Sequence, residues 1–250
     1  MIRARVAVAT LALSVATAAF AQSLKFTPPR LLKAQLPALP APTVVGGGEV
    51  LIEATVGRDG ALNRPIILRG TPPYTQMVLD AIATWRFRPA GVVGLDGVET
   101  TVEMPISIGA VYRPPILMNA PTIGEPSREW SRPSSDVAYP LSTEMPNYPP
   151  QARDEGVVLF EVALNEAGTM TDARGVASTG GFESASRDAL SKWRFRAGSY
   201  RARPVPSTAY ALFGFRSPVV SSSPGQLPIV PPTSKPPFPP DFTPPPPPKP

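Results

Sequence analysis

The chain has 250 residues, no cysteine, no histidine and a formal net charge of +5 at pH 7. Without cysteine there are no disulfide bonds, and without histidine a zinc site would have to rest on carboxylates alone. The arginines cluster only at Arg194, Arg196, Arg201 and Arg203, with no interleaved aromatic residues of the kind that stack on bases. We interpret them as a solvated basic rim, and nucleic acid is not an expected partner.

The N-terminus, residues 1–21, has the layout of a secretory signal peptide. Arg3 and Arg5 precede an uncharged run, Val6–Ala19, and Ala19-Phe20-Ala21 has the small residues of a cleavage site. The run is shorter than the roughly 20 apolar residues of a membrane span. Cleavage after Ala21 and export are therefore predicted, with contact to a membrane only through partners. The alternative is an uncleaved signal that anchors the chain in the inner membrane.

Proline-rich segments separate the remaining parts of the chain. They form a leader at 22–46, a connector at 113–143 and a tail at 217–250 that ends in Pro244–Pro248, Lys249 and Pro250. Proline fixes φ and lacks an amide hydrogen, so such segments favour extended polyproline II over a packed core. The leader and connector are predicted to be linkers, and the tail is predicted to be disordered.

Two segments of the chain repeat one another at a constant spacing. Val50 and Val158 are 108 residues apart, and so are Trp85 and Trp193. Two copies with a long spacer are too few for a solenoid. The chain is therefore predicted to hold two copies of one small domain, at 47–112 and 144–216.

Each copy shows the same order of hydrophobic patterns. A period of two predicts half-buried strands at Val50–Val56 and Val158–Leu164, with Glu53 and Glu161 on their solvent side. The first copy continues with a hairpin turn, a strand, a helix and a last strand at Asp59-Gly60, Ile66–Leu68, Met77–Trp85 and Thr100–Ile108. The second copy continues in the same order at Ala167-Gly168, Ala173–Ala177, Ala185–Trp193 and Thr208–Phe215. These elements predict an α+β fold, each domain a short antiparallel sheet packed on one helix.

The second copy carries several motifs in a recognisable order. It opens with Tyr148-Pro149-Pro150-Gln151-Ala152, and its helix ends with Trp193-Arg194-Phe195. Over about Glu144–Phe215 it resembles the C-terminal domain of TonB-type energy transducers. The first copy is similar as far as Trp85-Arg86-Phe87-Arg88-Pro89, but it has Thr43-Val44-Val45-Gly46 in place of Tyr-Pro-x-x-Ala. We interpret it as a degenerate copy.

The resemblance implies a periplasmic module that binds an extended peptide of an envelope or outer-membrane transport protein. In the family this peptide is added as a strand beside the last strand of the domain. Pro105 is expected to interrupt that strand in the first copy, whereas Phe213 is the matching residue in the second. Peptide binding is therefore predicted at Thr208, Tyr210, Leu212, Phe213 and Phe215.

Other functional classes have less support from the residues. The chain shows no arrangement for a serine nucleophile and no lysine-bearing phosphate loop, so no enzyme activity and no cofactor are expected. Energy transduction for outer-membrane transport is an alternative if the N-terminus stays anchored, although the histidine motif of the family transducers is missing. A structural envelope scaffold is a further alternative.

Overall fold

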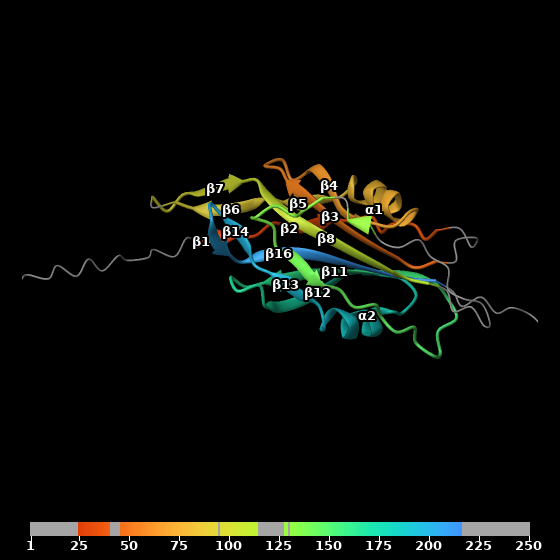
Figure 1. Ribbon diagram of the computed structural model, residues 1–250. Helices are drawn as coiled ribbons and strands as arrows, with labels where there is room; N and C mark the ends of the chain where they lie inside the picture. Colours follow the sequence, from red (N-terminus) through yellow and green to blue (C-terminus); the bar gives the residue numbers. More distant parts are fainter. Residues whose placement is uncertain (1–24, 41–45, 95, 115–127, 130, 217–250) are drawn as a thin grey trace, which may run out of the picture.

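One seven-stranded sheet runs through both repeats (Figure 1). The computed structural model describes residues 25–40, 46–94, 96–114, 128–129 and 131–216. The predicted signal peptide and the predicted tail lie outside these ranges. Within the described residues, no helix has the length and apolar character needed to cross a membrane.

The first repeat supplies the strands at one end of the sheet and one helix. Its elements are β1 (Lys25–Thr27), β2 (Arg30–Lys33), β3 (Gly48–Val56), β4 (Leu62–Gly70), α1 (Tyr74–Ile82), β5 (Arg86–Arg88), β6 (Ala90–Val93), β7 (Glu99–Val102) and β8 (Met104–Arg113). The turn between β3 and β4 contains Gly60 at φ 77°, a backbone region that glycine adopts without strain. The last strand predicted at Thr100–Ile108 is in fact two strands, β7 and β8.

The second repeat supplies the other end of the sheet. A short β9 (Arg128–Glu129) precedes it, and its elements are β10 (Tyr139–Ser142), β11 (Gly156–Leu164), β12 (Met170–Ser178), α2 (Glu183–Leu190), β13 (Arg194–Arg196), β14 (Gly198–Tyr200), β15 (Arg203–Val205) and β16 (Ser207–Phe215). The α+β class is confirmed, and both repeats keep the predicted order of strand, turn, strand, helix and last strand, with the short strands β5–β7 and β13–β15 added between the helix and the last strand.

The two repeats are joined by their last strands. The strand order is β12-β11-β16-β8-β3-β4-β9, and β16 pairs with β8 in parallel from Ala209 opposite Ser107 to Phe215 opposite Arg113. All other pairs between its strands are antiparallel. The two separate sheets of the prediction are therefore replaced by a single one.

The helices lie on opposite faces of this sheet, with α1 above it and α2 below it in Figure 1. The α1 face gathers Val78 and Trp85 with Leu159 and Leu212 of the second repeat. The α2 face gathers Leu190 and other side chains of the second repeat with Val111 of the first. The central strands are thus buried on both faces, and Leu51, which shares the face of Glu53 in the period of two, is buried as well.

The proline-rich leader and connector are packed parts of the repeats where they are described. In the leader β2 pairs with β5, and in the connector β10 pairs with β13 at the equivalent place. The indole N–H of Trp85 donates to the carbonyl of Gln35, and that of Trp193 donates to the carbonyl of Glu144. The repeating unit therefore includes the proline-rich segment before it, and the boundaries at 46 and 143 fall inside the folded units.

Glu53 and Glu161, expected on the solvent side, are largely enclosed and join the two repeats reciprocally. Glu161 Oε2 accepts a hydrogen bond from the backbone N–H of Leu31, 2.9 Å away in the leader of the first repeat. Glu53 Oε2 accepts one from the backbone N–H of Ser134, 2.8 Å away in the segment that leads into the second repeat. Each proline-rich segment thus pairs with its own repeat and donates to a glutamate of the other.

Candidate functional site

The edge predicted to accept a peptide is already paired. One side of β16 pairs with β11 from Ser207 to Phe215, and its other side pairs with β8 from Ala209 to Phe215. The backbone groups that strand addition needs are therefore engaged within the chain. The prediction of an open run of amides along this strand is wrong for this arrangement, because the first repeat covers it.

The predicted peptide-binding side chains are brought together in one strand but lie in the core. Thr208, Tyr210, Leu212, Phe213 and Phe215 are all buried. Tyr210 and Leu212 belong to the cluster under α1, whereas Phe213 and Phe215 belong to the cluster under α2. Thr208 precedes the ladder with β8. Their direct contact with a peptide would require β8 to leave the sheet.

The sequence pattern matched Pro105 of the first repeat to Phe213 of the second, but these two residues do not occupy equivalent positions in the sheet. Pro105 pairs with Thr55, and the equivalent pair in the second repeat is Ala163 with Thr208. The spacing between the repeats shortens from 108 to 103 residues in the last strand, because the β6–β7 hairpin is longer than β14–β15. Pro105 is the second residue of β8 and does not interrupt it.

Within the described residues, the outer strand β12 has a partner on one side only. It pairs with β11 and ends the sheet, so its other side carries backbone groups without a strand partner. At the opposite end of the sheet, β9 pairs with Arg69 and Gly70 of β4, and Pro65 lacks an amide hydrogen there. The edge of β12 is thus the more open of the two.

Two charged side chains of α2 stand beside the edge of β12. Arg187 donates a hydrogen bond of 2.7 Å to the carbonyl of Ala173 and forms a 3.0 Å ion pair with Glu183. A Cβ atom at Gly175 would lie 2.9 Å from Glu183 Oε1, so this carboxylate reaches over the strand. Both charged side chains are about half exposed, at 49%. They can meet the side chains of a chain segment laid along β12.

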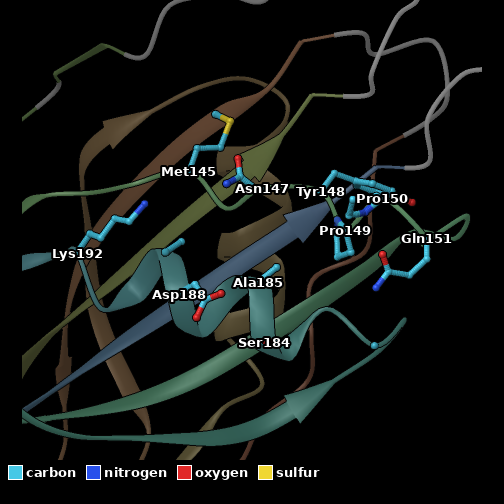
Figure 2. A pocket seen from close by; sticks show the side chains of 12 residues that line it. Met145, Asn147, Tyr148, Pro149, Pro150, Gln151, Ser184, Ala185, Asp188 and Lys192 are labelled. Atoms are coloured by element: carbon cyan, nitrogen blue, oxygen red, sulfur yellow. The ribbon is translucent and has the colours of Figure 1, made fainter.

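A groove lies on another side of α2, against the Tyr-Pro motif. It encloses about 280 Å³ between Tyr148–Gln151 and the helix residues Ser184, Ala185 and Asp188 (Figure 2). Tyr148 also packs on Phe182, with ring centroids 5.4 Å apart. The motif therefore closes the aromatic core at the end of β16.

An equivalent hollow exists in the first repeat. It encloses about 190 Å³ between Gln35–Ala38 and the α1 residues Met77, Asp80 and Ala81. Its proline-rich wall is the leader, so Leu39-Pro40 takes the place of Tyr148-Pro149. Leu39 precedes Val50 of β3 by 11 residues and Tyr148 precedes Val158 of β11 by 10, so the segment equivalent to the Tyr-Pro motif is Leu39-Pro40 and not Thr43-Val44-Val45-Gly46.

The comparison with known families covers the second repeat. Residues 144–216 match the family described as Gram-negative bacterial TonB protein C-terminal. The match stops short of the first repeat, and no curated protein matches the chain. The motifs at Tyr148–Ala152 and Trp193–Phe195 both fall inside the matched range. Residues 144–216 therefore belong to the TonB C-terminal domain family.

Proposed function

We propose that the chain is a periplasmic, TonB-like protein-binding module that takes up an extended peptide of an outer-membrane protein by strand addition at the outer edge of β12. The family of residues 144–216 supports an envelope protein as the partner. The observation that carries the proposed position is the pairing of β16 with β8, because it leaves β12 as the outer strand of the second repeat.

The chemistry at β12 suits an added strand. β12 has nine residues, Met170–Ser178, and its run Asp172–Gly175 pairs with β11 without a register shift, so an added strand has a regular central segment to pair with. The carbonyl of Ala173 is held by Arg187, a long exposed side chain that can turn away when a peptide amide takes its place. Backbone pairing supplies affinity, and the Glu183–Arg187 pair beside the edge supplies a preference for charged side chains in the peptide.

The test is calorimetric titration of the full chain with a synthetic peptide from the N-terminal periplasmic segment of an outer-membrane receptor. The matched control is the same peptide with N-methyl groups on every second backbone nitrogen, in both alternating registers. Only every second amide of an added strand points toward β12, so one of the two methylated peptides loses its ladder donors and the other keeps them. Each lost hydrogen bond costs about 0.5–1.5 kcal/mol, so the first peptide should bind about tenfold or more weakly, while the second should bind almost as well as the unmodified peptide.

Equal binding of the peptide and both methylated forms would rule out strand addition at any edge. No binding of any receptor peptide would favour the structural scaffold, a role that the self-pairing of β8 with β16 supports.

A further inference from the structure

A large basic pocket lies between the hairpins of the two repeats, at the end of the molecule that carries β7 and β14 in Figure 1. It encloses about 560 Å³. Arg58, from the turn after β3, reaches it from the first repeat, and Arg201 and Arg203 reach it from the second. Val92, Val102 and Tyr200 supply apolar walls. The pocket exists because the two repeats are paired.

The charged residues that line this pocket are all arginines. No carboxylate lines it, and in the described ranges no carboxylate lies within 4.0 Å of the guanidinium groups of Arg58, Arg201 or Arg203. The nearest acid in sequence, Asp59, accepts a hydrogen bond from the backbone N–H of Ala61 at 3.0 Å. Three like charges around one cavity repel each other, and the attraction of each arginine to an anion bound between them offsets this repulsion.

The wall that carries Arg201 and Arg203 is fixed by local structure. Arg201 and Ala202 form a tight turn at φ 51° and 59°, and the guanidinium of Arg201 lies over the ring of Tyr200, 5.4 Å from its centroid. Tyr200 in turn packs on Phe26, with centroids 5.7 Å apart. Val102 of the pocket wall and Val205, just beyond the pocket, belong to one small core. The backbone of the wall that carries Arg201 and Arg203 therefore has a defined shape, and the guanidinium of Arg201 has a defined position, before any ligand arrives.

We propose that this pocket binds a phosphate group, either of a free phosphate compound or of a phospholipid headgroup. A guanidinium offers a planar fork of N–H donors that fits phosphate oxygens two at a time. Three such forks match a dianionic phosphate better than a single carboxylate, and the apolar walls accept the body of a phosphate ester. This site is separate from the edge of β12 and does not depend on peptide binding.

The experiment uses the full chain, with inorganic pyrophosphate as the soluble probe and vesicles of phosphatidylglycerol or phosphatidylcholine as the lipid probes. The variants are Arg58→Gln and Arg201→Gln, and the control is Arg194→Gln, an exposed arginine outside the pocket. Pyrophosphate binding should weaken about tenfold in each pocket variant and stay unchanged in the control.

The lipid arm distinguishes the two sources of phosphate. Flotation with phosphatidylglycerol vesicles that is lost in the pocket variants assigns a headgroup, whereas binding of pyrophosphate alone assigns a soluble phosphate compound. Equal loss in Arg194→Gln would show general charge attraction and overturn the proposal. Absence of binding to both pyrophosphate and the phosphatidylglycerol vesicles would overturn it as well.

Discussion

Trp193, which follows α2 of the second repeat, lies directly over Gly109 in β8 of the first. A Cβ atom added at Gly109 would lie 3.0 Å from Cζ3 of Trp193 and 3.2 Å from its Cη2. Trp193 is 3% exposed, so the indole is a core group shared by both repeats. The indole of Trp193 thus fits only because Gly109 has no side chain. Since the core of the second repeat includes this part of the first, the repeats should unfold together.

Replacement of Gly109 by Ala tests this contact. Overpacking of a tight core costs about 1–3 kcal/mol, and we expect a loss of that size in the free energy of unfolding, measured in urea. The variant Trp193→Phe gives the second side of a double-mutant cycle, because a smaller ring leaves room for the new methyl group. A coupling energy near zero between the two substitutions would contradict the contact.

The leader strand β2 offers a matched pair of neighbouring leucines. Leu31 is 5% exposed and packs in the α1 core, whereas Leu32 is 67% exposed. Leu31→Ala should lower the free energy of unfolding by about 2–5 kcal/mol, and Leu32→Ala should change it by less than about 0.5 kcal/mol. Equal, small effects in chemical denaturation would show that the leader is a linker after all.

Two buried tyrosines differ in their hydroxyl partners. The hydroxyl of Tyr210 donates to Glu161 Oε2 at 3.1 Å, while that of Tyr112 is buried without a hydrogen-bond partner among the described residues. At pH 7, Tyr210→Phe should cost about 1–3 kcal/mol, because it removes a donor from an enclosed carboxylate. Tyr112→Phe should be neutral or stabilising. Thermal unfolding measures both variants, and a lower midpoint for Tyr112→Phe than for Tyr210→Phe would contradict the prediction.

The same tyrosines predict a loss of stability in alkali. Burial raises the pKa of both Tyr210 and Tyr112 well above the ordinary value of 10, and the carboxylate of Glu161 adds to the rise for Tyr210. The folded state therefore holds these protons more tightly than the unfolded state. The contribution of the two protonated hydroxyls to the free energy of unfolding is fully present below pH 10, and it is lost as the pH rises toward the folded-state pKa. Either Phe variant should flatten the fall of the free energy of unfolding above pH 10, and an unchanged slope in both would contradict the burial argument.

Much of the repeat could be predicted from local patterns. The period of two located β3 and β11, and the spacing of apolar residues located both helices within a few residues. A tryptophan at the end of an amphipathic helical pattern indicates a core residue, and both Trp85 and Trp193 are buried. These features depend on contacts within about forty residues, which one repeat contains by itself.

The joint between the repeats could not be predicted in the same way. The parallel pairing of β16 with β8 joins residues about a hundred positions apart, and no local pattern encodes it. One signal was available: β16 is apolar on both of its faces from Tyr210 to Phe215, as expected of a strand buried on both sides rather than at an edge. The reciprocal bonds of Glu53 and Glu161 follow from the joint and were hidden for the same reason.

The central claim is that β8 holds the edge of β16 and that a peptide is added to β12 instead. Residue-resolved amide hydrogen exchange of the full chain, with and without the receptor peptide, tests both halves. Slow exchange is predicted in Ser207–Phe215 before the peptide is added, with new protection in Met170–Ser178 afterwards. Rapid exchange in Ser207–Phe215 without the peptide, followed by protection there when it binds, would contradict the account.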